Sequence, residues 1–166
     1  DMSRMFTGAT TANPDTTNWD TSAVTTMSGM FEGATSANPD TTNWDTSAVT
    51  DMSRMFIGAT SANPGASNWN TAAVTDMSRM FEGASVANPN ASSWDTSALT
   101  DTIWMFSNAV SFDRNIGSWN VTALTSANTM FNGVTLSASN YSNLLIGWDA
   151  QNLQSGVVFD GGNSTY

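Results

Sequence analysis

The sequence at 18–31, NWDTSAVTTMSGMF, recurs almost unchanged at 43–56 as NWDTSAVTDMSRMF. The same step of 25 in the numbering separates equivalent aromatic and sulfur-containing residues over most of the sequence. The sets are Trp19, Trp44, Trp69, Trp94 and Trp119; Phe6, Phe31, Phe56, Phe81, Phe106 and Phe131; and Met5, Met30, Met55, Met80, Met105 and Met130. A fixed period of this kind is typical of stacked repeats, in which each unit contacts only its neighbours.

Within one repeat, the pattern predicts a short helix, a turn and a short strand. Apolar residues follow at steps of three, three, one and three, which is one face of a helix, at Val24, Met27, Met30, Phe31 and Ala34. Thr25 stands where an N-cap is needed and Gly33 where a left-handed C-cap is favoured. The segment 17–21 is rich in β-forming residues, with Trp19 on one face. We therefore expect an α/β solenoid of leucine-rich-repeat-like coils, each a short parallel strand plus a short helix, with Trp, Met and Phe inside.

The periodicity divides the chain into two parts. Residues 1–133 hold five to six repeats, and residues 134–166 leave the pattern with a denser apolar cluster around Leu144 and Trp148. Stacked repeats need a terminal unit that covers the end of the core, so we expect 134–166 to be a C-terminal capping unit. Because the chain starts in the middle of a repeat without a signal peptide, we expect a segment of a longer, extracellular protein.

Composition excludes several classes of partner. The formal net charge is −10, with 14 acidic residues against four arginines. Nucleic acid is a poor partner for such a chain, because binding to phosphates requires clustered Lys and Arg. No apolar run has the length of a membrane span, so membrane insertion is not expected.

The residue inventory also argues against catalysis. The sequence contains no His, Cys or Lys, which removes the usual nucleophile–base pairs, disulfides and His or Cys metal sites. Pairs of carboxylates could in principle hydrolyse glycosides. The available carboxylates occupy repeat-equivalent positions and not a unique pocket, so we expect no enzymatic activity.

Polar residues flanking the tryptophans form the candidate binding face. They alternate with Trp along the predicted strand and would be exposed: Asn18, Asp20, Asn43, Asp45, Asn68, Asn70, Asp95 and Asn120. Stacked carboxylates repel one another, and Ca²⁺ bound by oxygen ligands would relieve this, although no Ca²⁺-loop motif is present. The alternative is that these residues are simply hydrated. No cofactor is required, and Ca²⁺ is the one metal worth testing.

Two further patterns have competing interpretations. Threonine repeats at Thr21, Thr46, Thr71 and Thr96, and again at Thr25, Thr50, Thr75, Thr100 and Thr125, as on some ice-binding surfaces. On the predicted helix, Asp1/Arg4, Asp51/Arg54 and Asp76/Arg79 would form surface ion pairs at a spacing of i, i+3. Trp104, an extra aromatic residue, has no assigned place.

The consensus W-D-T-S-x-V-T-x-M-x-x-M-F-x-G-A closely resembles the repeats of BspA-like leucine-rich-repeat surface proteins of bacteria. The resemblance covers 1–133 and implies a secreted or surface-anchored protein, of a kind often described as an adhesin. It supplies no ligand.

These observations lead to one expected function and one alternative. We expect an extracellular repeat segment of a bacterial surface adhesin, which recognises a protein or glycan of a host or neighbouring cell. The alternative is a structural spacer without its own ligand. An N-terminal end rich in Met and Phe could also pair two copies end to end.

Overall fold

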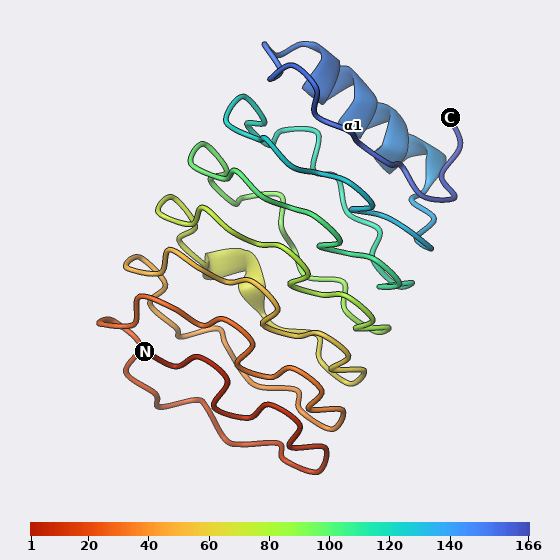
Figure 1. Ribbon diagram of the computed structural model, residues 1–166. Helices are drawn as coiled ribbons and strands as arrows, with labels where there is room; N and C mark the ends of the chain where they lie inside the picture. The colour runs from red at the N-terminus through yellow and green to blue at the C-terminus, as the bar shows by residue number, and fades with distance from the viewer.

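The computed structural model describes residues 1–166 and shows a stack of flattened coils covered at one end by a helix (Figure 1). We number the coils by the sequence period, so that coil 1 is 1–25, coil 2 is 26–50, coil 5 is 101–125 and coil 6 begins at 126. The helix α1 (Ala138–Asp149) packs on coil 5, at the opposite end of the stack from the N-terminus. A short 3-10 helix, η1 (Ala66–Asn68), lies within coil 3.

The prediction of an α/β solenoid is wrong, because the repeats contain neither the helix nor the strand that this architecture requires. α1 and η1 are the only helices in the chain. Parallel backbone pairing is limited to isolated single-residue bridges, and no sheet forms. The bridged pairs are Thr26–Asp51, Asp51–Asp76, Asp76–Asp101, Asp101–Ser126 and Ala127–Phe159.

Left-handed residues prevent the predicted helix at 25–33. Gly29 has φ 62° and Gly33 has φ 71°, and a left-handed residue ends a helical turn. The segment instead forms successive tight turns, in which the Met30 and Ala34 N–H groups donate to the Met27 and Phe31 carbonyls at 3.1 and 3.0 Å. Gly33 is left-handed as predicted, but Thr25 has no helix to cap. The same conformation recurs in the other coils at Arg4, Gly8, Arg54, Gly58, Arg79, Gly83, Trp104, Asn108, Thr129 and Gly133.

Alternate backbone N–H groups of this segment bond to the next coil. A helix would direct these donors within its own coil, so the bonds between coils replace the helical ones. Four carbonyls of coil 3 accept from coil 2 at 2.6–3.0 Å: Met27 to Asp51, Gly29 to Ser53, Phe31 to Met55 and Gly33 to Ile57. The pattern continues along the stack with the same offset between donor and acceptor.

Side chains, and not a backbone ladder, connect the coils where a strand was predicted at 17–21. The buried Thr21 hydroxyl donates to the Asp45 carbonyl at 2.9 Å, and the Trp44 indole N–H donates to the Thr16 carbonyl at 3.4 Å. Thr46, Thr71 and Thr96 repeat the threonine bond. This threonine column is therefore buried and presents no surface to ice.

The second threonine column is exposed, but its hydroxyls are also occupied. The Thr50, Thr75, Thr100 and Thr125 hydroxyls donate to the carbonyl of the equivalent threonine in the preceding coil at 3.0–3.3 Å. A row of hydroxyls bound to carbonyls in this way has fewer donors left for ordering water.

The core consists of the aromatic and methionine columns, as predicted. Phe31, Phe56, Phe81, Phe106 and Phe131 are completely buried, and neighbouring rings along the Phe column lie 5.3–5.7 Å apart and nearly parallel. Three pairs of neighbouring tryptophans stack similarly at 5.9–6.1 Å: Trp19–Trp44, Trp69–Trp94 and Trp94–Trp119. Each inner coil therefore covers apolar surface on both neighbours, which is why the period must be kept without insertions.

Residues 134–166 continue the columns with a different backbone. The Trp148 indole N–H donates to the Ile116 carbonyl at 3.1 Å, the bond that Trp119 makes to Ala91 one coil earlier at 2.9 Å. Asp113 accepts from the Ser137 N–H at the start of α1 at 2.9 Å. α1 therefore replaces the tryptophan-bearing part of coil 6 and packs on coil 5. No helix of the structure combines the length and hydrophobicity required to cross a bilayer.

Thr41 has a buried hydroxyl without a hydrogen-bond partner. The equivalent Thr16 hydroxyl donates to the Asp40 carbonyl at 2.5 Å. We expect Thr41→Val to raise the free energy of unfolding by about 1 kcal/mol, because it removes an unsatisfied buried hydroxyl at nearly constant volume. Thr16→Val, which removes a satisfied hydroxyl, should instead destabilise; urea unfolding of both variants checks the pair, and equal changes would contradict the assignment.

Candidate functional site

The polar face predicted to bind a ligand is fully on the surface of the stack. All eight residues are exposed. They form two columns along coils 1 to 5, the first of Asn18, Asn43 and Asn68, and the second of Asp20, Asp45, Asn70, Asp95 and Asn120. We refer to the second set as the Asp20 column.

Each residue of the Asp20 column is held in a tight turn by its own side chain. Oδ1 of Asp20 accepts from the Ser22 N–H at 3.1 Å and from the Ser22 hydroxyl at 2.6 Å. Asp45 accepts the same two bonds from Ser47, at 2.9 and 2.6 Å. The second carboxylate oxygen of each remains without a protein donor, so it can face a partner in a fixed geometry.

Hydrogen bonding keeps these carboxyls ionised. The Ser22 hydroxyl lowers the pKa of Asp20, and the Ser47 hydroxyl lowers the pKa of Asp45, against a small opposing repulsion from Asp20. Ser97 lowers the pKa of Asp95 in the same way. A carboxylate that accepts hydrogen bonds favours its charged form, so the column is negatively charged at neutral pH.

A parallel column, displaced by five positions toward the N-terminus, was missed by the sequence reasoning. Asp15 and Asp40 accept from the Thr17 and Thr42 hydroxyls at 2.6 Å, and Asn90 accepts from the Ser92 hydroxyl at 2.8 Å. The available signal was an Asp or Asn at position i with a hydroxyl residue at i+2, which recurs twice in most repeats. Coil 3 breaks this column with Gly65, immediately before η1.

The geometry does not concentrate carboxylates as a Ca²⁺ site requires. No group of three or more acidic side chains is arranged to hold a metal ion. Ca²⁺ takes six to eight oxygen ligands, whereas the Asp20 column supplies at most one free carboxylate oxygen per coil. We expect calorimetry to give the same melting temperature with EDTA as with added Ca²⁺. A higher melting temperature with Ca²⁺ would support Ca²⁺ binding and contradict this expectation.

A third acidic column lies at the isolated bridges and is half-buried. Asp51, Asp76 and Asp101 stack on one another, and each accepts the N–H of residue i+2 at 2.7–2.8 Å. Burial raises the pKa of Asp101, and the neighbouring Asp76 carboxylate raises it further. The charged form of Asp101 therefore works against folding.

We expect Asp101→Asn to stabilise the protein slightly at neutral pH. Because the pKa of Asp101 is higher in the folded protein than in the unfolded chain, stability falls as pH rises through the folded pKa. Asparagine keeps the acceptor for Ile103 without the charge, so its advantage should be present at pH 7 and absent near pH 3. Melting temperatures at both values test this. Asp45→Asn, where folding lowers the pKa, is the matched control and should not stabilise at pH 7.

The predicted helix-surface ion pairs are wrong. They required Asp and Arg one helical turn apart, and no helix exists there. The one ion pair joins Arg79 to Glu82 at 3.0 Å. The same guanidinium lies over the Trp104 ring, 4.7 Å from its centroid, which gives the extra tryptophan a place one coil after Arg79.

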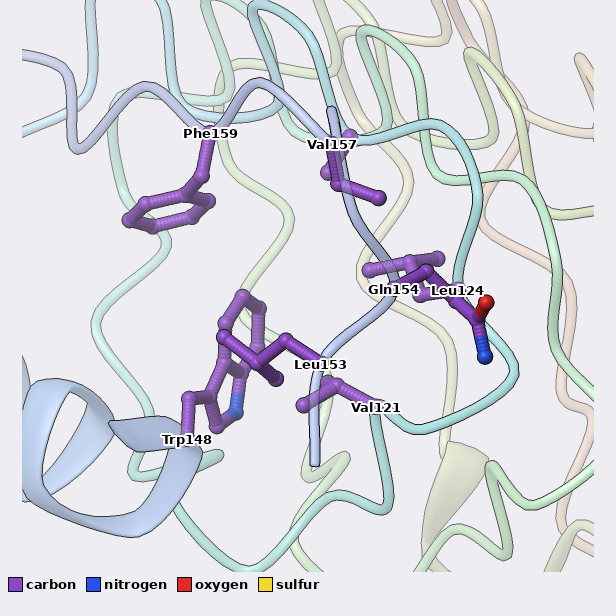
Figure 2. A pocket seen from close by; sticks show the side chains of 8 residues that line it. Val121, Leu124, Trp148, Leu153, Gln154, Val157 and Phe159 are labelled. Atoms are coloured by element: carbon purple, nitrogen blue, oxygen red, sulfur yellow. The ribbon is translucent and has the colours of Figure 1, made fainter. Parts of the chain in front are cut away.

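A hollow lies between coils 5 and 6 and the C-terminal segment, where no binding residues were predicted (Figure 2). Its volume is about 80 Å³, and seven of the eight residues around it are hydrophobic. Figure 2 shows Trp148 and Phe159 on one side and Leu124 and Val121 on the other. A second hollow of about 200 Å³ shares Trp148, Leu153 and Phe159 with the first.

Comparison with known families gives one match. The family model described as "Mycoplasma protein of unknown function, DUF285" matches residues 1–65 and 38–148, which is most of the chain. The two overlapping matches agree with a protein made of repeats. No curated protein and no solved structure matches the chain.

Proposed function

We propose that this chain, which belongs to the DUF285 family of Mycoplasma proteins of unknown function, is an extracellular repeat segment of a bacterial surface adhesin. It would recognise a protein or glycan of a host or neighbouring cell through the Asp20 column and the adjacent asparagines. The observation that carries the proposal is that all eight of these polar residues are exposed. The resemblance of the repeat sequence to BspA-like surface proteins supports a secreted or cell-surface location.

The fixed turns favour recognition through many modest contacts. A side chain already bound to its own backbone loses little further conformational entropy when a partner binds it. The backbone N–H groups of Ser22 and Ser47, which donate to Asp20 and Asp45, supply this restraint in coils 1 and 2. Exposed polar contacts are individually weak, so affinity would come from engaging several coils at once.

The charge of the face restricts the partner. Ionised carboxylates only accept hydrogen bonds. The Asp20 column and the column of Asn18, Asn43 and Asn68 together present carboxylate and amide groups but no cationic group. A partner rich in hydroxyl, amide or cationic groups fits this surface, whereas nucleic acid does not. Proteins with exposed Lys or Arg, and neutral glycans, are the classes that we expect to bind.

The test is a glycan and extracellular-protein array, probed with wild type and with Asp20→Asn/Asp45→Asn/Asp95→Asn. Asn70 and Asn120 occupy the same turns, so the triple variant should fold normally. We expect binding to fall about tenfold or more, at roughly 0.5 kcal/mol per lost charge contact. Asp15→Asn/Asp40→Asn is the control, because it removes charge from identical turns in the neighbouring column. A hit that both variants weaken equally would contradict a role for the Asp20 column.

A spacer without its own ligand is the second candidate, and one observation favours it. Every residue of the Asp20 column already bonds within its own turn, so each has a structural role that requires no partner. An array without hits, together with a destabilised Asp20→Ala/Asp45→Ala variant, would favour the spacer.

End-to-end pairing of two copies stays a prediction. At the open end of coil 1, Met5 is 49% exposed and Phe6 and Trp19 are only partly buried, whereas their equivalents in coils 2 to 5 are buried. Sedimentation at increasing concentration would detect such pairing, and Met5→Gln should weaken it.

A further inference from the structure

Two positions of the repeat change their residue type toward the C-terminal end of the stack, and the two changed residues Val121 and Ala127 meet where coils 5 and 6 face the C-terminal segment. The Ala127 position is already Thr102 in coil 5. Coils 2, 3 and 4 place a completely buried methionine at the position of Ala127, namely Met27, Met52 and Met77. Coils 1 to 4 place a buried threonine at the position of Val121, namely Thr21, Thr46, Thr71 and Thr96. Alanine at 127 has a smaller side chain than the methionine of coils 2 to 4, and valine at 121 lacks the hydroxyl of the threonine in coils 1 to 4.

Both changes line the 80 Å³ hollow described above. It is lined by Val121 and Leu124 of coil 5 and by Ala127 of coil 6. Trp148 and four residues of the C-terminal segment complete the lining: Leu153, Gln154, Val157 and Phe159 (Figure 2). The side chain of Gln154, the one polar lining residue, donates to the Thr122 carbonyl at 2.7 Å and helps to hold this segment in place. A methionine at the position of Ala127 would extend into this space, whereas the alanine side chain leaves it open.

We propose that this hollow is a binding site for a small uncharged hydrophobic molecule, such as a single aromatic ring. This inference goes beyond the proposed recognition face and does not depend on it.

The lining selects an apolar occupant over water or an ion. A buried water needs two to four polar partners, and the hollow offers one side-chain amide that is already bonded to a carbonyl. A charged ligand would lose its hydration without a counter-charge in the lining. Apolar cavities lined in this way remain dry and take up ligands such as benzene.

One ring needs more room than this hollow alone provides. An apolar cavity of about 150 Å³ is known to bind benzene. The hollow measures about 80 Å³, so a ring seated in it would extend past Leu153 into the adjoining hollow of about 200 Å³. Leu153, which is 54% exposed, borders both hollows and can shift toward solvent without uncovering the core. Trp148 and Phe159 would contact the ring from the cap side.

The test is a titration of the whole chain with benzene, followed by methyl chemical shifts and Trp fluorescence. We expect saturable shifts at Val121, Leu124 and Val157 and a higher melting temperature at saturation. Ala127→Met restores the residue of coils 2 to 4, fills the hollow, and should weaken binding about tenfold or more. Benzoate, which has the same ring with a charge, should not bind.

A second variant keeps the test decisive if Ala127→Met fails to fold. Val121→Thr restores the threonine of coils 1 to 4 with little change of volume, and a hydroxyl facing the ligand should weaken benzene binding measurably. The absence of saturable shifts in the wild type would overturn the proposal. Equal binding by the wild type and by a folded Ala127→Met or Val121→Thr variant would overturn it as well.

Discussion

Replacing Phe81 by alanine is expected to lower the free energy of unfolding by about 3–5 kcal/mol, through lost burial and the cavity left behind. Phe81 is completely buried and stacks between Phe56 at 5.4 Å and Phe106 at 5.7 Å. For a chain of this length the loss corresponds to a fall in melting temperature of about 6–20 °C. Calorimetry and urea unfolding both measure it.

Two control variants test whether the effect of Phe81→Ala depends on its position inside the stack. Phe6→Ala, at the open end, should cost less, because Phe6 is only partly buried and has a Phe neighbour on one side alone. Val86→Ala, in the same coil as Phe81 but 45% exposed, should change stability by less than about 1 kcal/mol. If Phe6→Ala destabilised as much as Phe81→Ala, the Phe column would not be a core shared between neighbouring coils.

Gly147→Ala is expected to destabilise the protein by about 1–3 kcal/mol, or more, through overpacking. Gly147 lies inside α1, where glycine to alanine ordinarily stabilises by about 1 kcal/mol. Here a Cβ atom on Gly147 would overlap the backbone carbonyl of Gly117 in coil 5, and backbone cannot rotate away as a side chain does. A loss of stability in place of the usual gain would therefore show that α1 contacts the stack at Gly147.

Asn143→Ala is the matched control for this prediction. Asn143 lies one turn earlier on α1 with an exposed side chain that makes no hydrogen bond within the protein, so alanine should stabilise slightly. Thermal unfolding of both variants, with the NMR signal of the Trp148 indole N–H as a local probe, separates loss of the cap from loss of the whole stack. A stabilising Gly147→Ala would show that α1 does not rest on Gly117.

Much of the core was predictable from the columns alone. Phe, Met and Trp at a constant step had to share one environment, and large apolar residues in such an arrangement are most stable inside. The exposed position of the Asp20 column followed from its alternation with tryptophan. Gly33 was expected to be left-handed and is, with φ 71°.

The secondary structure within each repeat could not be predicted in the same way. Apolar spacing of three, three, one and three suits a helix, but it also suits successive tight turns that point the same residues inward. Arg54, Arg79 and Trp104 adopt the left-handed conformation in the middle of the predicted helix, and none of them signals it, since glycine is the usual residue there. The ion pairs failed for the same reason, because they presupposed a helical turn.

The candidate sites also include features that the sequence predicts and features that only the structure shows. The exposure of the Asp20 column was predicted from the sequence, and its role in binding stays a prediction. The Asp15 column and the stacking of Arg79 on Trp104 depend on which turns lie side by side, which the sequence does not show. The hollow beneath residues 153–159 has no sequence motif at all. Ala127 and Val121 are ordinary residues until coils 5 and 6 and the cap are brought together around them.

The period, the residues inside and the negative charge follow from the amino-acid sequence alone, because each of these depends only on which side chains are present and where they recur. Tertiary structure decided the backbone of each coil. The N–H groups of Met27, Gly29, Phe31 and Gly33 take their acceptors from the next coil, so their partners exist only once the coils have stacked. A hydrogen bond to the neighbouring coil cannot be inferred from local propensity, and here such bonds replaced both the helix and the sheet.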